Sequence, residues 1–150
     1  MTTILIADDE PPLVRALQNH LAHWPDLQVV ATARNGLEAA QAIAQWQPDV
    51  AFLDIQMPGM TGLEVAQGIE GATRVVFVTA FDAYAVQAFE QEAIDYVLKP
   101  VTAERLQRTV ERVRRTLAAP QEDGHLLRAL QRLLPAAAQA TPPLKWVRAS

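Results

Sequence analysis

The sequence contains no cysteine among its 150 residues. Disulfide bonds, thiol nucleophiles and cysteine-ligated zinc sites are therefore excluded from its chemistry. Its hydrophobic runs are short, and none approaches the roughly 20 residues that span a bilayer as a helix. The first residues also lack the basic start and longer apolar stretch of a signal peptide. From these absences we expect a cytoplasmic protein without a membrane partner.

Half of the residues are hydrophobic, which suits one domain with a sizeable core. The net charge of −4 conceals an uneven distribution. Up to Leu98 the chain carries 3 basic and 13 acidic residues, a balance of −10, and from Lys99 onward it carries 10 basic and 4 acidic residues, a balance of +6. The acidic part suits a cation site. The basic part suits either a solvated helix face or an acidic partner such as nucleic acid.

Short apolar runs alternate with segments of helical periodicity along the chain. The runs predict five strands, at Ile4–Ala7, Val29–Ala33, Val50–Leu53, Val75–Val78 and Tyr96–Leu98. The helical segments lie at Leu13–Trp24, Leu37–Trp46, Leu63–Ile69, 82–89 and Leu106–Leu117. Asn35 is a suitable cap for the second helix, and Trp24 and Trp46 are expected in the core. This alternation predicts an α/β fold with a doubly wound, five-stranded parallel sheet.

The predicted sheet domain covers residues 1–118. Residues 119–143 have the composition of a linker and contain a short amphipathic helix at about 124–134. A helix of that length is marginal in water by itself, so we expect it to dock on its own domain or to pair with a second copy. Residues 144–150 have the pattern of a first strand, and we expect them to begin a further domain that this chain does not include.

Five polar residues directly follow or end predicted strands: Asp8, Asp9, Asp54, Thr79 and Lys99. The carboxyl ends of parallel strands meet at one edge of the sheet, where α/β proteins bind ligands. Clustered carboxylates repel one another unless a cation joins them, and oxygen ligands of this kind favour Mg²⁺. Asp54 could then act as a nucleophile toward a phosphoryl group. Thr79 and Lys99 could contact the phosphoryl oxygens, and Pro100 permits a cis peptide after Lys99.

Four motifs occur in order, Asp8-Asp9-Glu10, Asp54-Ile55-Gln56-Met57-Pro58, Thr79-Ala80 and Lys99-Pro100. Together they resemble the receiver domain of two-component response regulators over about residues 3–118. The resemblance implies a flavodoxin-like receiver fold and a phosphoacceptor, Asp54, that takes its phosphoryl group from a sensor histidine kinase. Such a domain signals, with at most slow self-catalysed phosphorylation and dephosphorylation.

The same resemblance implies a role for each matched residue. The Mg²⁺ ligands would be Asp8, Asp9, Asp54 and the backbone carbonyl of Gln56, with Asp8 acting largely through a water molecule. Thr79 and Lys99 would assist the reaction. Thr79 and Tyr96 would form the switch that reports phosphorylation.

The stretch from Thr79 to Pro100 further resembles the receivers attached to LytTR-type DNA-binding domains. That resemblance implies transcription regulation, with DNA contacted only through the missing C-terminal domain. It also implies a homodimer through the 82–89 helix, the 95–98 strand and one face of the 105–117 helix. The arginines spaced along this last helix, at 105, 108, 112 and 115, fit either a solvated face or a dimer contact.

Other interpretations of these residues have less support. Asp8 and Asp9 could simply cap the helix that begins near Pro11. A Mg²⁺-dependent phosphatase of the haloacid dehalogenase type also uses an aspartate nucleophile, but its Asp-x-Asp pattern has an acid where this sequence has Gln56. A phosphorylation-independent interaction module would retain the fold without using Asp54. The three histidines, His20, His23 and His125, form no credible metal site.

Overall fold

The computed structural model describes residues 1–81 and 92–118. Its elements are β1 (Thr2–Ala7), α1 (Pro11–Leu21), β2 (Leu27–Ala33), α2 (Gly36–Trp46), β3 (Val50–Leu53), α3 (Gly62–Gln67), β4 (Arg74–Thr79), β5 (Asp95–Leu98) and α5 (Ala103–Ala118). The chain forms two compact units, Met1–Arg114 and Arg115–Ser150, and the first contains the whole sheet. The predicted 82–89 helix, the linker with its 124–134 helix and the 144–150 strand lie outside the described residues.

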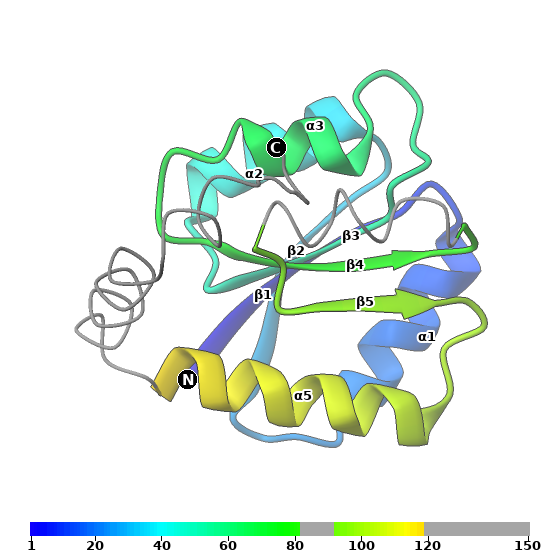
Figure 1. Ribbon diagram of the computed structural model, residues 1–150, viewed down its shortest axis with the longest axis vertical. Coiled ribbons are helices and arrows are strands. Elements are labelled where there is room, and N and C mark those ends of the chain that lie inside the picture. The colour runs from blue at the N-terminus through cyan, green and yellow to red at the C-terminus, as the bar shows by residue number, and fades with distance from the viewer. Residues whose placement is uncertain (82–91, 119–150) are drawn as a thin grey trace, which may run out of the picture. The chain divides into compact units, whose positions relative to one another are not determined.

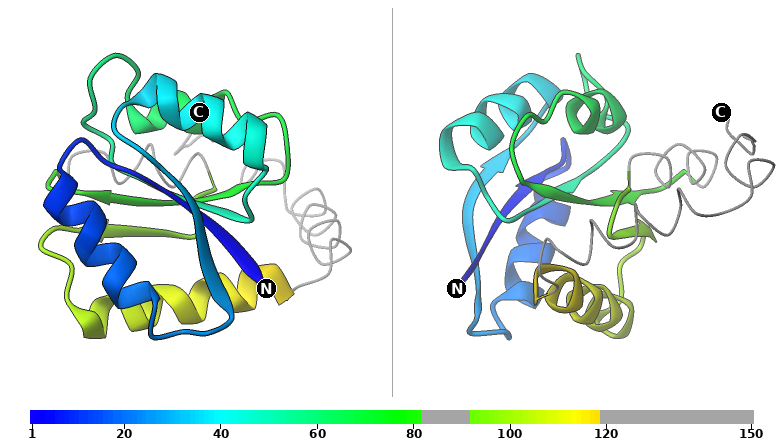
Figure 2. Two further views of the ribbon diagram at one scale, coloured as in Figure 1. Left: turned by 180° about the vertical axis from the view of Figure 1, so that it is seen from behind. Right: turned by 60° about the vertical axis from the view of Figure 1, so that its left-hand side comes forward.

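The five strands form one parallel sheet in the order β2-β1-β3-β4-β5. Helices α2 and α3 cover one face of the sheet, and α1 and α5 cover the other (Figures 1 and 2). The prediction of a doubly wound, five-stranded parallel sheet is therefore confirmed. Four of the five strands extend one or two residues beyond the predicted limits, and the third matches them. No helix in the described part of the chain is long and apolar enough to cross a membrane.

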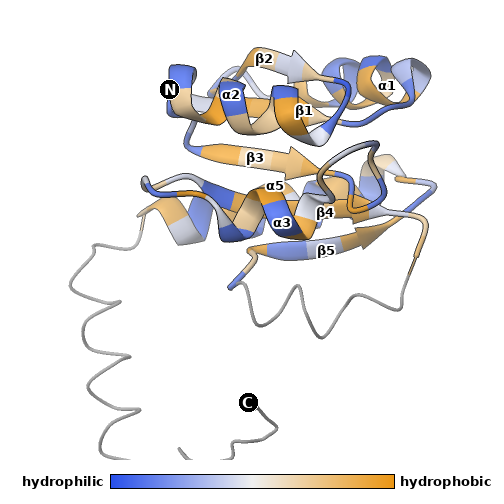
Figure 3. Ribbon diagram, turned by 90° about the horizontal axis from the view of Figure 1, so that it is seen from above, coloured by the Kyte–Doolittle hydropathy of each residue, from blue (hydrophilic) through white to orange (hydrophobic). Residues whose placement is uncertain are grey.

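The core lies on both faces of the central strands. All four residues of β3 are buried, because neighbouring strands flank it on both sides and helices cover both of its faces. Figure 3 shows β3 as an almost unbroken hydrophobic arrow, whereas α5 alternates between hydrophobic and hydrophilic residues. Leu106, Val110 and Val113 form the buried stripe of α5. The centre of the sheet is thus strongly apolar, so a site of polar residues can form only beyond the ends of the strands.

A side-chain cap defines the start of α2. The Asn35 side chain accepts a hydrogen bond from the Glu38 N–H at 2.8 Å, which confirms the predicted cap of α2. The other end of α2 corrects a prediction, because Trp46 is 51% exposed instead of buried. Trp46 is the last residue of the helix, and Gln47 turns the chain in a left-handed conformation directly after it. The second predicted core tryptophan, Trp24, is half-buried.

Candidate functional site

The sheet itself positions the polar residues at its carboxyl edge. The Asp54 N–H donates to the carbonyl of Ala7 at 2.9 Å, so the β1–β3 ladder continues into the acidic residue. The Lys99 N–H donates to the carbonyl of Thr79 at the same distance of 2.9 Å, which extends the β4–β5 ladder. These bonds place the backbone of each residue directly beyond a buried strand end. The polar residues at these strand ends therefore lie at one edge of the sheet, as predicted.

The ammonium group of Lys99 lies among three carboxylates. Its Nζ is 3.0 Å from Asp8 Oδ2, 3.0 Å from Asp54 Oδ2 and 2.7 Å from Glu10 Oε1. The side chains of Asp8 and Asp54 are 2% and 5% exposed, and that of Lys99 is 13% exposed. Lys99 thus supplies, from within the protein, a positive charge that offsets the repulsion between the acids. The peptide bond from Lys99 to Pro100 is cis, as the sequence permits.

Burial and charge act in opposite directions on these groups. Burial raises the pKa of the Asp8 carboxyl to about 6, although a hydrogen bond from the Glu10 N–H and the contact with Lys99 both oppose the rise. Burial would lower the pKa of Lys99, but its contacts with Glu10, Asp8 and Asp54 outweigh this effect and raise it. Lys99 therefore remains protonated at neutral pH, while the charge of Asp8 depends on its neighbours.

The acidic residues also have the chemistry of a Mg²⁺ site. Carboxylate oxygens of Asp8, Asp9, Glu10 and Asp54 all lie within 4.8 Å of one another. Asp8 and Asp54 are buried and the other two are exposed, so the cluster has an inner and an outer side. Oxygen ligands open to water on one side suit Mg²⁺, which usually retains several waters. The Gln56 N–H donates to Asp54 Oδ1 at 3.2 Å, and the predicted role of its carbonyl as a ligand stays a prediction.

Asp8 does not serve as the cap of α1. The residue at the cap position is Glu10, whose side chain makes no capping hydrogen bond, and prolines occupy the first two helical positions. Asp8 Oδ1 instead accepts a hydrogen bond from the Glu10 N–H at 2.8 Å, and Asp8 Oδ2 contacts Lys99. The interpretation of this acid as an ordinary helix cap is therefore wrong.

The two predicted switch residues hold the same loop. Thr79 is fully buried at the end of β4, and its Oγ1 accepts a hydrogen bond from the Phe81 N–H at 3.4 Å. The hydroxyl of Tyr96, on the neighbouring strand β5, donates to the carbonyl of Phe81. Phe81 is thus bonded through its N–H to one predicted switch residue and through its carbonyl to the other. If Thr79 moved, its hydrogen bond to Phe81 would shift Phe81, and the bond from Tyr96 to the Phe81 carbonyl would shift with it.

Two glycines allow the loop after β3 to pack closely against the starts of α2 and α3. A Cβ atom on Gly62 would lie 2.3 Å from the carbonyl oxygen of Asp54, and one on Gly36 would lie 2.2 Å from the carbonyl oxygen of Met60. Both distances are far below van der Waals contact with backbone atoms. The start of α3 is therefore packed against the Asp54 backbone, and the start of α2 is packed against the same loop.

A buried acid on β5, Asp95, was not among the predicted site residues. The Asp95 side chain is 3% exposed and accepts hydrogen bonds from Arg105 Nη1 at 2.8 Å, Arg112 Nη1 at 2.7 Å and Thr109 Oγ1 at 2.7 Å. Arg105 is therefore mostly covered, with a side chain 24% exposed, whereas Arg112 pairs with Asp95 and remains 49% exposed, as on a solvated face. Arg105 also donates to the carbonyl of Tyr96 at 3.2 Å, so this network fastens the end of β5 to α5.

The Asp95 network implies a pH dependence with a defined sign. Burial alone would raise the pKa of the Asp95 carboxyl, but hydrogen bonds from Arg105, Thr109 and the Tyr96 N–H hold it below its ordinary value. A carboxyl with a lowered pKa in the folded state stabilises the fold above its unfolded pKa of about 4. That contribution is lost as the pH falls through the lower, folded pKa.

We expect Asp95→Asn to reduce the free energy of unfolding by about 2 kcal/mol at neutral pH, less than for a fully buried pair because both arginines are partly exposed. The difference from wild type should shrink as the pH falls below about 4 and vanish below the lower, folded pKa, since protonated Asp95 then resembles asparagine. Urea denaturation from neutral pH to about pH 3 measures this. Asp26→Asn, which breaks the exposed pair with Arg114, is the control and should have a much smaller effect. A stability difference between wild type and Asp95→Asn that is as large at pH 3 as at neutral pH would contradict stabilisation by the ionised Asp95 carboxylate.

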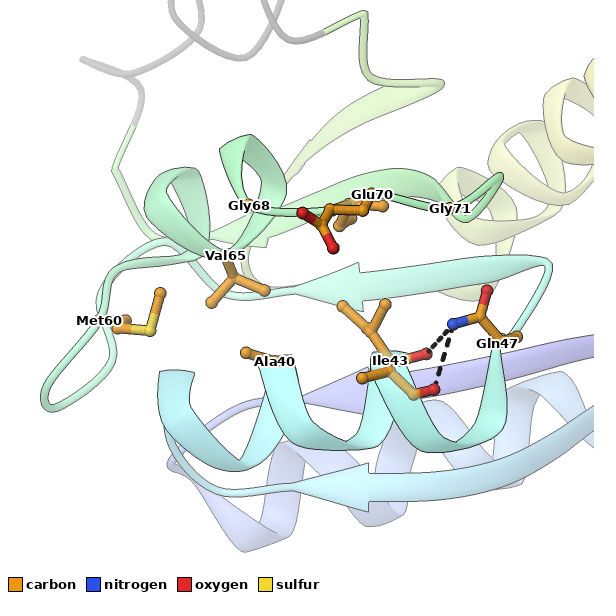
Figure 4. Close-up of a pocket in the computed structure, with 10 residues that line it drawn as sticks. Ala40, Ile43, Gln47, Met60, Val65, Gly68, Glu70 and Gly71 are labelled. Carbon is orange, nitrogen blue, oxygen red and sulfur yellow. Dashed lines mark hydrogen bonds between the residues drawn. The ribbon is translucent and has the colours of Figure 1, made fainter.

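Two hollows differ in their relation to the acids. One has a volume of about 770 Å³, is open to solvent beside the site, and is lined by Asp9, Glu10, Pro11, Pro12, Leu13, Ala16, Lys99 and Pro100. The other, of about 240 Å³, lies between α2 and α3, where Ile43 and Val65 face one another (Figure 4). The Gln47 amide in this second hollow is bonded to helix carbonyls. Only the first hollow gives access to Lys99 and to two of the acids.

Comparison with known proteins agrees with this geometry. The family model described as the response regulator receiver domain matches residues 4–111. Among solved structures, the receiver domain of AraT from Geobacillus stearothermophilus is 31% identical with a TM-score of 0.73, covering 81% of this chain and 98% of that one. The response regulatory domain of mrkE from Klebsiella pneumoniae is 29% identical with a TM-score of 0.72, covering 77% of this chain and 97% of that one.

Curated relatives extend the comparison beyond this domain. An uncharacterized response regulatory protein of Vibrio cholerae is 45% identical over 99% of this chain and 59% of its own length. The transcriptional regulatory protein BtsR of Escherichia coli is 43% identical over 76% of this chain and 48% of its own length. The chain thus spans about half the length of the curated relatives it matches. From the matched residues, the sheet order and these identities, we conclude that the chain belongs to the response regulator receiver domain family.

Proposed function

We propose that this domain accepts a phosphoryl group on Asp54 from a sensor histidine kinase and transmits the modification through its β4–β5 edge. The observation that carries the proposal is the placement of Asp54. Its carboxylate is almost fully buried at the mouth of β3, within 3.0 Å of the Lys99 ammonium and close to three further acids. A carboxylate placed in this way beside a cation can act as a nucleophile toward a phosphorus atom.

Membership of the family supports the donor and the metal. Receiver domains are signalling domains that interact with histidine kinases and typically bind Mg²⁺ at an acidic pocket. Here Asp8, Asp9, Asp54 and the carbonyl of Gln56 would hold the ion. When bound, Mg²⁺ would neutralise charge on the phosphoryl oxygens. A carboxylate oxygen of Asp54 would form the new P–O bond while the bond from phosphorus to the kinase histidine nitrogen breaks.

Lys99 and Thr79 would then contact the oxygens of the phosphoryl group on Asp54. The Lys99 ammonium, already in contact with Asp54, would transfer part of its interaction to a phosphoryl oxygen. The Thr79 hydroxyl would donate to another and would loosen its present bond with the Phe81 N–H. Because the Phe81 carbonyl is bonded to Tyr96, the change would pass to the exposed side of β5.

We further propose that the output is transcriptional and acts through an attached LytTR-type DNA-binding domain. The resemblance of the stretch from Thr79 to Pro100 supports this, as does the printed role of BtsR as a transcriptional regulatory protein. A homodimer through the 82–89, 95–98 and 105–117 segments would be the form that phosphorylation favours, and the first of these segments lies outside the described residues. We place the receiver at 1–118, the linker at 119–143 and the start of the output domain at 144–150.

The test is intact mass after incubation with acetyl phosphate and Mg²⁺. Wild-type protein is expected to gain one phosphoryl group, and the gain should disappear when Mg²⁺ is chelated. Asp54→Asn should show no gain in mass. Asp26→Asn, which removes an exposed aspartate between α1 and β2, should gain one phosphoryl group as wild type does. Incorporation that survives Asp54→Asn would reject Asp54 as the acceptor. Absence of incorporation into wild type even with a phosphorylated kinase would favour a phosphorylation-independent module.

A further inference from the structure

Glu10 differs from the other acids around Lys99 in two respects. Its Oε1 makes the shortest of the three contacts with Lys99 Nζ, 2.7 Å against 3.0 Å for both Asp8 and Asp54. Its side chain is 62% exposed, whereas those of Asp8 and Asp54 are 2% and 5% exposed. Glu10 is also absent from the set of residues that we expect to hold Mg²⁺. Among the partners of Lys99 in residues 1–81 and 92–118, it is therefore the one that the proposed function leaves without a role.

The remaining partners of Lys99 create a conflict. Asp8 and Asp54 are both expected Mg²⁺ ligands, so the ammonium and the metal ion would share the same carboxylates. Two cations at neighbouring carboxylate oxygens repel one another strongly in a poorly hydrated site. Lys99 nevertheless has to remain close, because its proposed partner is a phosphoryl oxygen on Asp54. A counter-ion outside the metal ligands would allow both cations to stay.

The geometry of Glu10 meets this need. The Lys99 side chain is a flexible four-carbon stem, and Glu10 lies on the solvent side of the cluster, where its carboxylate is free to follow a small movement of the ammonium. The Glu10 backbone N–H is fixed by Asp8 Oδ1 at 2.8 Å, so the residue cannot drift away from the site. Its side chain is 62% exposed, while its backbone is held by this hydrogen bond.

We propose that Glu10 is a positioning residue that draws the Lys99 ammonium to the outer side of the cluster, so that Lys99 and Mg²⁺ occupy the site together. This inference rests on the proposed function, because it assumes that the metal binds at Asp8, Asp9 and Asp54. Without Glu10, the ammonium would have only the metal ligands as partners and would compete with Mg²⁺ more strongly.

A double-mutant cycle on Mg²⁺ affinity tests the inference. Calorimetric titration with MgCl₂ alone would be carried out on wild type, Glu10→Gln, Lys99→Met and the double variant. With Lys99 present, Glu10→Gln should weaken Mg²⁺ binding about fivefold, the upper end of what one solvent-exposed ion pair contributes. In the Lys99→Met background, Glu10→Gln should weaken Mg²⁺ binding by less than about twofold, because only a solvent-screened charge is lost.

The controls separate the possible explanations. Glu70→Gln removes the same charge from an exposed residue of the hollow between α2 and α3 and should leave Mg²⁺ affinity unchanged. Glu10→Asp, which keeps the charge, should restore part of the affinity. Equal weakening by Glu10→Gln in both backgrounds would overturn the inference, because Glu10 would then act on the metal directly. Failure of the wild type to bind Mg²⁺ would instead contradict the proposed metal site.

Discussion

Replacing Lys99 with methionine is expected to lower the free energy of unfolding by about 3 kcal/mol in buffer without Mg²⁺. Methionine retains most of the apolar stem, so the loss would arise from the missing charge more than from a cavity. Asp8 and Asp54, which are almost fully buried, would then repel one another without a cation between them. Chemical denaturation monitored by circular dichroism measures the difference.

Added Mg²⁺ should recover much of that stability. A divalent ion would take over the neutralising role of the ammonium, and a ligand that binds only the folded state stabilises it. The Lys99→Met variant should also bind Mg²⁺ more tightly than wild type, because no cation competes for Asp8 and Asp54. Arg108→Met is a matched control, since Arg108 is exposed and makes no ion pair with residues 1–81 or 92–118. A deficit that Mg²⁺ leaves unchanged would show that Lys99 acts elsewhere in the fold.

Replacing Gly62 with alanine is expected to lower the free energy of unfolding by about 2 to 3 kcal/mol, as in other overpacked positions. The added Cβ would lie 2.3 Å from the oxygen and 2.9 Å from the carbon of the Asp54 carbonyl group. Both are backbone atoms that the β1–β3 ladder holds in place, so the chain would have to move around the proposed acceptor. Phosphorylation by acetyl phosphate should therefore slow by about tenfold or more, since small misplacements of reacting groups are costly.

The other end of α3 provides the control for this prediction. A Cβ on Gly68 would have its nearest neighbour at 3.6 Å, the carbonyl oxygen of Glu64, which is ordinary contact. Gly68 also has a right-handed backbone conformation, so alanine is compatible with it. Gly68→Ala should be nearly neutral in stability and in the rate of phosphorylation. Similar effects of the two substitutions would indicate that general damage to α3, and not pressure on Asp54, explains the first result.

Several features of the domain were determined by the sequence alone. The apolar runs predicted every strand of the sheet, because a parallel strand buried on both faces has to be apolar along its length. The positions of Asp8, Asp54, Thr79 and Lys99 at strand ends followed from the same reasoning, since the carboxyl ends of parallel strands share an edge. Asn35 was identified as a cap because its side chain bonds to the backbone only a few residues away.

The tertiary structure decided which side chains became partners. Glu10 contacts a lysine 89 residues away in the sequence, and Asp95 pairs with Arg105 and Arg112 at separations of 10 and 17 residues. Helical periodicity could place the two arginines on the polar side of α5, but it could not show that a buried acid on β5 lies beneath them. Trp46 was misplaced for a related reason, because its burial depends on where the chain turns. Periodicity assigns a residue to a face, whereas the identity of its partner depends on how the elements pack.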